Sequence, residues 1–270
     1  MLINSYVFAA ASTLWTPAQI TTALWLDAAD AETLFTTDSG STLVTNGSSV
    51  GRWNDKSGNS NNLSQATSGS SPTFNATGQN GKGVIIFNGI SSFLERSQSD
   101  LSLNWTCVIA AKNNNITGDQ IYVSQGSTSS SNPRWQLDRS GTNARIVRRN
   151  DAGAIQLPMQ GTHAVASLIQ AGTSDGSLIG VSLNGAGLST AAAVSGVFST
   201  NRLVVGSLYT GFSSPSATSF FNGSMFEVVY APSMLSTLDR QKIEGYLAHK
   251  WGLTANLPAG HPYKSTAPTI

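Results

Sequence analysis

The sequence predicts an all-β sandwich that is closed by one C-terminal helix. Its apolar runs are short, as at residues 84–87, 105–111 and 178–183, and Gly, Asn, Ser or Pro bounds each run. Turn residues recur roughly every ten to fifteen positions, which is typical of a sandwich of short strands. Only 11% of the residues are charged, so hydroxyl and amide groups must cover much of the surface. The chain has 270 residues, and we expect one large β domain.

Further strands are expected between these runs. Asn184 and Gly185 predict a hairpin turn, because both residue types tolerate the positive φ that tight hairpins need. Residues 36–82 are rich in Ser, Thr, Asn and Gly and are expected to form long surface loops around a few short strands. The remaining strands are expected at residues 24–26, 120–124, 134–138, 144–148, 162–170 and 202–206.

The stretch from residue 220 to residue 253 predicts a last strand and then a helix. Met225, Glu227 and Val229 alternate with apolar or aromatic neighbours, so they are expected to share one face of the strand. The strand should lie in the core, because most of its residues are apolar.

The helix is expected over residues 236–251. Ser236 is placed to cap its N-terminus, and Gly252 stands where a left-handed residue often ends a helix. Ile243, Leu247 and Trp251 recur every four residues and give the helix one apolar side. We expect this side to pack on the rim of the sheet that the preceding strands form.

Three blocks of the sequence resemble laminin-G-like, concanavalin A-type domains of bacterial and phage surface proteins. They are F-x-G-x-M-x-E-V-x-Y-x-P from residue 221 with its following helix, WLDAAD at residues 25–30, and W-x-D-x-S-G-x-x-N at residues 53–61. The resemblance implies a two-sheet antiparallel jelly roll over residues 23–253. An N-terminal arm (residues 1–22) and a C-terminal tail (residues 254–270) would flank it.

The resemblance also implies a non-enzymatic structural subunit of a tailed-phage virion, such as a capsid decoration, head-fibre or tail-fibre protein. Such a subunit would contact other virion proteins, form a homo-oligomer and lie at the virion surface, with glycan or host-surface binding as an added role. Two alternatives remain, because the fold serves many functions. They are a carbohydrate-active enzyme of the same fold and a bacterial surface adhesin.

Catalytic motifs do not support the enzyme alternative. Glycoside hydrolysis needs two carboxyl groups held roughly 5 to 10 Å apart. Concanavalin-type glycanases carry theirs in an alternating E-x-D cluster on one strand, whereas Glu227 stands alone on its strand. The three histidines have no metal-ligand spacing, and no G-x-S-x-G motif occurs.

No cofactor is expected, except that calcium is considered for one group of acidic residues. Asp27, Asp30 and Asp55 lie in oxygen-rich segments that could supply calcium ligands. The favoured alternative is that these carboxylates cap turns through nearby backbone amides. Cys107, the only cysteine, lies in an apolar run and is expected to be an inert core thiol.

Glycan binding is expected on loops that present an aromatic ring. Trp135 follows a Ser/Asn-rich loop and could stack on a sugar, although packing within its own sheet is the alternative. Asn132 and Arg134 beside it could donate to hydroxyls, and Tyr209 and Phe212 stand in a second Gly/Ser-rich loop.

Assembly contacts are expected from an apolar arm and a basic hairpin. The basic hairpin is either a solvated face or a surface that pairs with a partner's carboxylates. The C-terminal tail, like the arm, is expected to be ordered by neighbouring subunits. The candidate assembly residues are Leu2, Ile3, Tyr6, Val7, Phe8, Arg145, Arg148 and Arg149.

Charge and hydropathy exclude two further partner classes. The net charge of +1 gives no general attraction to nucleic acid. No run approaches the about 20 apolar residues of a membrane helix, so membrane insertion is not expected. The first residues lack the basic start of a signal peptide, so synthesis in a host cytoplasm without one is expected.

Overall fold

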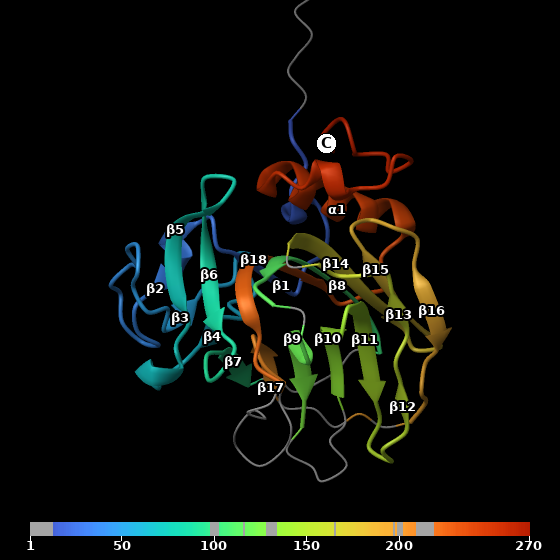
Figure 1. Cartoon of the computed structure of the whole chain (residues 1–270), viewed down its shortest axis with the longest axis horizontal. Helices are drawn as coiled ribbons and strands as arrows, with labels where there is room; N and C mark the ends of the chain where they lie inside the picture. Colours follow the sequence, from blue (N-terminus) through green and yellow to red (C-terminus); the bar gives the residue numbers. More distant parts are fainter. Residues whose placement is uncertain are drawn as a thin grey trace, which may run out of the picture.

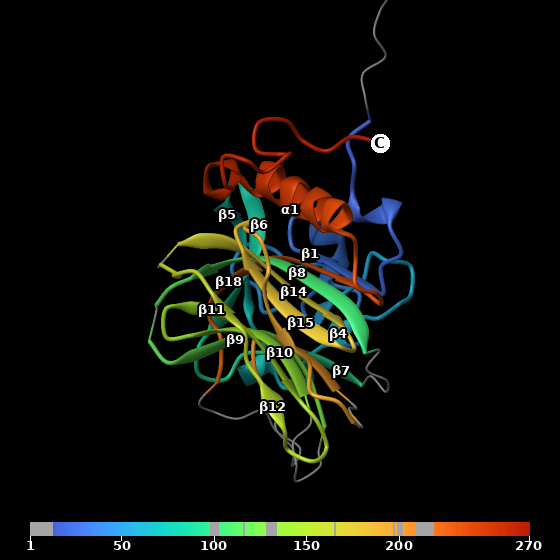
Figure 2. The same cartoon turned by 90° about the vertical axis from the view of Figure 1, so that its right-hand side faces the viewer.

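The computed structural model describes residues 13–97, 103–115, 117–127, 134–164, 166–196, 198, 202–208 and 219–270. Within these residues, two antiparallel sheets stack as a jelly-roll-like sandwich, and α1 (Thr237–Trp251) covers one of them from outside (Figures 1 and 2). The predicted all-β sandwich with one C-terminal helix is therefore confirmed.

The sheet beneath α1, here called the helix-side sheet, has the strand order β16-β15-β14-β8-β18-β6-β5, and β1 also pairs with β18. Its strands are β1 (Leu24–Asp27), β5 (Thr73–Gln79), β6 (Lys82–Asn88), β8 (Asn104–Asn113), β14 (Ser167–Asp175), β15 (Leu178–Leu183), β16 (Ser189–Ala192) and β18 (Asn222–Ala231).

The opposite sheet has the order β12-β11-β10-β9-β17-β7-β4-β3-β2, and β13 also pairs with β11. Its strands are β2 (Leu34–Phe35), β3 (Arg52–Trp53), β4 (Leu63–Ser64), β7 (Leu94–Ser97), β9 (Asp119–Gly126), β10 (Arg134–Ser140), β11 (Asn143–Arg149), β12 (Ile155–Gln156), β13 (Met159–Gln160) and β17 (Arg202–Val205).

Most predicted strands lie on observed ones, and the main difference concerns β14. The prediction began this strand at residue 162, but β14 begins at Ser167 and continues to Asp175. The reason is that the backbone N–H of His163 donates to the carbonyl of Thr142 in the β10–β11 turn, outside the helix-side sheet. Asn184 and Gly185 both have positive φ values, 53° and 75°, and form the predicted hairpin turn between β15 and β16.

A β-bulge in β18 changes which residues share a face. The pairing with β8 shifts between Met225 and Glu227, so Phe226 and Glu227 both face α1. Met225 and Val228 face the sandwich interior. The prediction that Met225, Glu227 and Val229 share one face is therefore wrong, because an extra residue inverts the alternation beyond it.

Two apolar clusters divide the molecule into three layers. The first fills the space between the sheets and contains Cys107, which is fully buried, so burial raises the pKa of its thiol. The second lies between α1 and the outer face of the helix-side sheet, where Leu247 and Trp251 contact Val108 and Phe226 of that face. The apolar side of the helix is thus buried as predicted, but on a sheet face and not on a rim.

The ends of α1 are those predicted. The hydroxyl of Ser236 accepts a hydrogen bond from the backbone N–H of Asp239 at 3.1 Å, which caps the N-terminus. Gly252 adopts a left-handed conformation (φ 70°, ψ 34°) and ends the helix. In the described part of the chain, no helix combines the length and the apolar character needed to span a membrane.

The C-terminal tail packs on its own domain. The His261 ring and the Glu244 carboxylate of α1 are both buried and lie 3.3 Å apart. Near the end of the chain, Leu14 and Thr269 form an antiparallel bridge. The prediction that neighbouring subunits order this tail is therefore wrong, because its buried contacts are with its own helix and N-terminal segment.

Candidate functional site

Glu227 is completely buried on β18 and forms the centre of a hydrogen-bonded cluster beneath α1. Its Oε1 accepts from Trp25 Nε1 at 2.7 Å and from the Tyr246 hydroxyl at 2.9 Å. Its Oε2 accepts from Trp251 Nε1 at 2.8 Å and pairs with Lys250 Nζ at 2.7 Å. Four donors from β1 and α1 therefore use the acceptor capacity of both carboxylate oxygens.

Asp27 lies opposite Glu227 in the β1–β18 register and extends the cluster towards the surface. Lys250 Nζ lies 2.6 Å from Asp27 Oδ1, and Lys56 Nζ lies 2.9 Å from Asp27 Oδ2 and 2.8 Å from Asp30 Oδ2. Burial opposes the ionisation of Asp27, but Lys250 and Lys56 outweigh it and lower the carboxyl pKa. Burial, together with the charge of Asp27, raises the pKa of Glu227 against the opposing effect of Lys250.

Asp27 and Glu227 are two neighbouring carboxyl groups, and glycosidases use a pair of carboxyl groups in catalysis. In such an enzyme one carboxyl protonates the leaving group, and the other attacks the sugar or activates water. Here the Lys250 ammonium bridges the two carboxyls, and indole and phenol donors cover the rest of Glu227. The pair is therefore arranged to anchor α1 on the sheet and not to exchange protons with a substrate.

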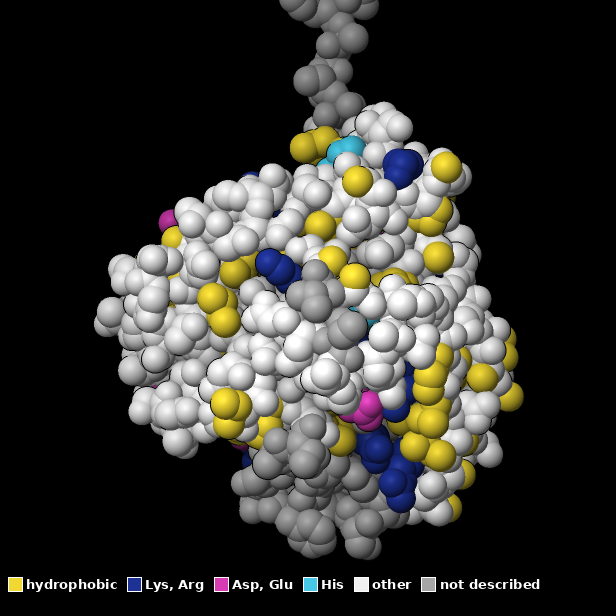
Figure 3. Space-filling view, in the orientation of Figure 1, with side chains coloured by type: hydrophobic (Ala, Val, Ile, Leu, Met, Phe, Trp, Pro, Cys, Tyr) yellow, Lys and Arg dark blue, Asp and Glu magenta, His cyan; other side chains and the backbone are white. Residues whose placement is uncertain are grey.

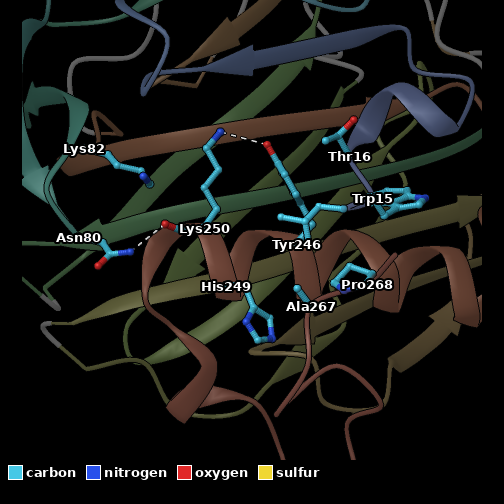
Figure 4. Close-up of a pocket in the computed structure, with 10 residues that line it drawn as sticks. Trp15, Thr16, Asn80, Lys82, Tyr246, His249, Lys250, Ala267 and Pro268 are labelled. Carbon is cyan, nitrogen blue, oxygen red and sulfur yellow. Dashed lines mark hydrogen bonds between the residues drawn. The ribbon is translucent and has the colours of Figure 1, made fainter. Parts of the chain in front are cut away.

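A hollow on one side of this cluster, here called the helix pocket, has a volume of about 350 Å³. Its lining is mainly apolar, and Figure 4 shows Lys250 and Tyr246 rising from α1 towards each other, with Trp15 and Pro268 on one side and Asn80 and Lys82 on the other. The volume falls within the about 300 to 1,000 Å³ of small-ligand sites. The residues that line the helix pocket are Leu14, Trp15, Thr16, Asn80, Lys82, Tyr246, His249, Lys250, Ala267 and Pro268.

A second hollow of about 280 Å³, here called the loop hollow, lies on the other side of the cluster. Its lining is rich in hydroxyl, amide and ammonium groups. Asn59 Nδ2 donates to Thr22 O at 2.8 Å and to Ser57 Oγ at 2.9 Å, which fixes the amide in place. The residues that line the loop hollow are Ala18, Ile20, Thr21, Thr22, Trp25, Lys56, Ser57 and Asn59.

Trp135 is not the exposed aromatic platform that the sequence predicted. Its side chain is 1% exposed, and its ring stacks on Trp105 with the centroids 4.4 Å apart. Its Nε1 donates to Gln125 Oε1 at 3.0 Å inside the sandwich. The prediction of a sugar contact at Trp135 is wrong because β10 turns this residue towards the interior, where the ring is fully buried between the two sheets and not half-buried in its own sheet.

The other predicted glycan and assembly residues divide into two groups. Arg134 is partly buried and donates to Gln136 Oε1 at 2.7 Å, so it does not stand free in a loop. The remaining residues lie outside the part of the chain that the structure describes, and they stay predictions. They are Asn132, Tyr209, Phe212, Leu2, Ile3, Tyr6, Val7 and Phe8.

The basic hairpin β10–β11 uses two of its three predicted partner-binding arginines internally. Figure 3 shows its basic side chains low on one face, next to acidic ones. Arg145 pairs with Asp138 at 2.7 Å and with Asp119 at 2.8 Å, and Arg148 donates to Ser174 Oγ at 2.9 Å. Both arginines are buried, so the hairpin is not a solvated face, and these two side chains are not displayed to a partner. The half-buried Arg149 stays a prediction.

The calcium candidates act instead as turn caps and lysine partners. Asp27 Oδ1 accepts from the backbone N–H of Ala29 at 3.1 Å, and Asp55 Oδ1 accepts from that of Ser57 at 2.8 Å. The turn-capping alternative is therefore confirmed at these two positions, whereas Asp30 pairs with Lys56. Among the described residues, no group of three or more His, Cys, Asp or Glu side chains is placed to hold a metal ion.

The sequence matches no protein-family model and no curated protein. Its fold is similar to that of several solved structures of low sequence identity. A Trypanosoma rangeli sialidase in complex with sialic acid aligns with a TM-score of 0.59 and 13% identity, over 90% of this chain and 36% of the sialidase. The botulinum neurotoxin type G receptor-binding domain aligns with a TM-score of 0.50 and 13% identity, over 83% of this chain and 52% of that domain.

The CBM40 module of the Ruminococcus gnavus IT-sialidase aligns over a smaller part, 51% of this chain and 81% of the module, with a TM-score of 0.43 and 16% identity. The alignments with the Trypanosoma rangeli sialidase and the toxin domain, with TM-scores of 0.59 and 0.50, establish a shared β-sandwich fold. The chain spans about a third of the sialidase, so the activity of that enzyme does not transfer with the fold.

Sequence reasoning missed the cluster around Glu227, although one signal was present. A lone Glu within an apolar strand must find partners, because an unpaired buried carboxylate is very costly. The nearby Trp25 and Trp251 offered indole donors, and Lys250 offered a charge. Their convergence depends on the bulge in β18 and on the placement of α1, which the residue pattern alone does not give.

Proposed function

We propose that this chain is a non-enzymatic, lectin-like subunit of a tailed-phage particle that binds a glycan weakly in the loop hollow. The observation that carries the glycan part is the lining of this hollow. Hydroxyl and amide groups of Thr21, Ser57 and Asn59 surround a volume of about 280 Å³. Sugars are recognised by such groups, because each hydroxyl needs a partner when it leaves water.

Preorganisation of the loop hollow supports the proposal. Asp27 and Asp30 hold the Lys56 ammonium, and the Asn59 amide donates two bonds to the loop itself. Within the described part of the chain, the side-chain oxygen of Asn59 (Oδ1) and the hydroxyl of Thr21 have no hydrogen-bond partner. They are therefore available to a ligand, and side chains that are already ordered lose little entropy when it binds.

The fold comparisons agree with a glycan ligand. One of the similar structures is a sialidase in complex with sialic acid, and another is a toxin's receptor-binding domain. The virion part of the proposal rests on the sequence resemblance to phage surface domains. The non-enzymatic part rests on the engagement of Asp27 and Glu227 by Lys250.

The experiment compares glycan-array and host-cell binding of a multivalent form of the protein. Single sites of this kind bind at about millimolar to micromolar concentrations, and many copies raise the avidity. The double variant Thr21→Val/Asn59→Ala should lose about thirtyfold in affinity, since two hydrogen bonds of about 1 kcal/mol each are removed.

The matched control is Thr77→Val/Asn75→Ala, which makes the same changes on β5, away from the loop hollow. This control should bind like the wild type. Equal binding by all three proteins would exclude the loop hollow as the site, and release of shortened sugars would show that the protein is an enzyme.

A further inference from the structure

The helix pocket differs from the loop hollow in chemistry. Trp15 and Tyr246 meet edge to face with their centroids 6.2 Å apart, and Leu14 and Pro268 continue the apolar wall. Leu14 is 63% exposed and Ile270, close by, is 70% exposed. Exposed apolar side chains beside a pocket are typical of a protein contact and not of a sugar site.

Residues 1–12, the first part of the N-terminal arm, join the described chain at Thr13, at the edge of this pocket. The carbonyl of Thr13 accepts from the backbone N–H of Ile270 at 3.0 Å, and Leu14 lines the pocket itself. Twelve residues precede Thr13, and those at positions 2, 3, 6, 7 and 8 are large and apolar. An apolar segment of this length therefore starts where the apolar pocket lies.

We propose that the helix pocket receives the apolar arm of a second copy of this chain, with Tyr6 and Phe8 as the anchoring side chains. In an extended segment these two residues point to the same face, so they can enter one pocket together. Aromatic side chains are the commonest anchors of such contacts. At the pocket, the Asn80 amide donates to the carbonyl of Lys250 and the Thr16 hydroxyl donates to Gln19, so their side-chain oxygens are the acceptors for N–H groups of the incoming arm.

The path of the chain favours a second copy over the arm's own pocket. Residues 13–15 pair antiparallel with residues 268–270. The chain traced back from Trp15 to Thr13 therefore runs from Pro268, which lines the pocket, towards Ile270 and away from the pocket. A return to the same pocket would need a tight reversal just before Thr13. Residues 9–11 are three alanines, and they lack the Gly, Pro, Asn or Asp that such reversals usually contain.

Disulfide crosslinking between two differently labelled chains tests this contact. One chain carries Ala9→Cys, next to the anchor Phe8, and the other carries Ala267→Cys at the pocket, and the two are co-expressed and oxidised. Cys107 is fully buried, so it gives no background. The expected product is a covalent heterodimer, identified by its mass.

The crosslinking control pairs Ala9→Cys with Ser177→Cys, an exposed position in the turn between β14 and β15. Absence of the heterodimer, or equal yield with the control, would overturn the proposal. So would an internal disulfide formed in place of an intermolecular one when both cysteines are placed in a single chain.

Sedimentation of the full chain gives an independent readout. The wild type should be an oligomer, and Tyr6→Asp/Phe8→Asp should be a monomer with an unchanged melting midpoint. Asn4→Asp/Ser5→Asp adds the same charge at polar positions and should stay oligomeric. A monomeric wild type, or equal dissociation by both variants, would show that the arm does not hold two copies together. Neither measurement depends on glycan binding, so this inference and the proposed function can fail separately.

Discussion

The indole nitrogen of Trp251 donates to Oε2 of Glu227 at 2.8 Å, and this bond ties the last turn of α1 to the middle of β18. Trp25 on β1 makes the corresponding bond to Oε1 at 2.7 Å. One buried carboxylate therefore joins two strands and the helix. Its charge is tolerated because Lys250 and three uncharged donors surround it, two indoles and one phenol.

We predict that Glu227→Gln destabilises the protein by about 3 kcal/mol or more. The amide keeps the shape of the side chain but leaves Lys250 with one of its two carboxylate partners, Asp27, and its NH2 group faces donors instead of acceptors. Breaking one half of a buried ion pair typically costs about 3 to 5 kcal/mol. Denaturant unfolding measures the change.

Glu95→Gln is the matched control for this change. Glu95 pairs with Arg202 at 2.9 Å, but both side chains are partly exposed, at 27% and 36%. Such a pair contributes about 1 kcal/mol or less. Equal and small losses in the two variants would mean that the cluster around Glu227 does not hold α1 in place.

Local signals in the sequence were sufficient for the order of elements. Ser236 and Gly252 mark the ends of α1, because a hydroxyl can cap the first turn and a residue that tolerates positive φ commonly ends the last one. The faces of β18 could not be predicted in this way. The bulge after Met225 depends on pairing with β8, which is more than 100 residues away in the sequence.

Both faces of β10 are buried, although its sequence suggested an exposed strand. Trp135 has polar neighbours, which indicated an exposed strand, yet Gln136, Asp138 and Arg139 are buried as well. Asp138 accepts two hydrogen bonds from Arg145, at 2.9 and 2.7 Å, so its charge is paired on the outer face of this sheet, whereas Leu137 and Ile146 beside them face the core. A polar residue on a strand is exposed to solvent only when no neighbouring strand supplies a polar partner. The sequence of a single strand does not reveal such partners.

We predict that Trp135→Ala costs about 3 to 5 kcal/mol of stability and leaves glycan binding by the folded protein unchanged. The ring fills the space between the sheets against Trp105 and Tyr230, so its loss creates a cavity. Thermal unfolding and glycan binding are measured on the same preparations, below the melting midpoint of the variant.

Trp135→Phe is the control for this prediction, because it keeps an aromatic ring in the stack and should cost less. A variant that melts like the wild type but no longer binds glycans would restore Trp135 as a binding residue.

His163 makes the stability of the fold depend on pH. The side chain is 3% exposed, and its Nδ1 lies 3.2 Å from Asn113 Nδ2. The Asn113 oxygen accepts from the Tyr122 hydroxyl at 2.9 Å, so the amide nitrogen is left to donate to Nδ1. In a protonated imidazole both ring nitrogens carry a hydrogen, so Nδ1 could no longer accept the hydrogen bond from Asn113. Burial, with a contribution from Arg139, lowers the pKa of His163 from 6.5 to about 4.

The sign of the effect follows from proton uptake. Between pH 6.5 and about 4 the unfolded chain protonates this histidine and the folded chain does not, so stability falls as the pH falls. A pKa difference of this size corresponds to a loss of about 3 kcal/mol once the pH is below both values.

We predict that His163→Asn, whose oxygen can still accept from Asn113, flattens this acid limb of the unfolding free energy. His249→Gln, a change at the half-exposed histidine of α1, should retain the limb. Unfolding free energies measured from pH 7 to pH 4 decide the matter, and an acid limb of unchanged slope in His163→Asn would assign the loss to other groups.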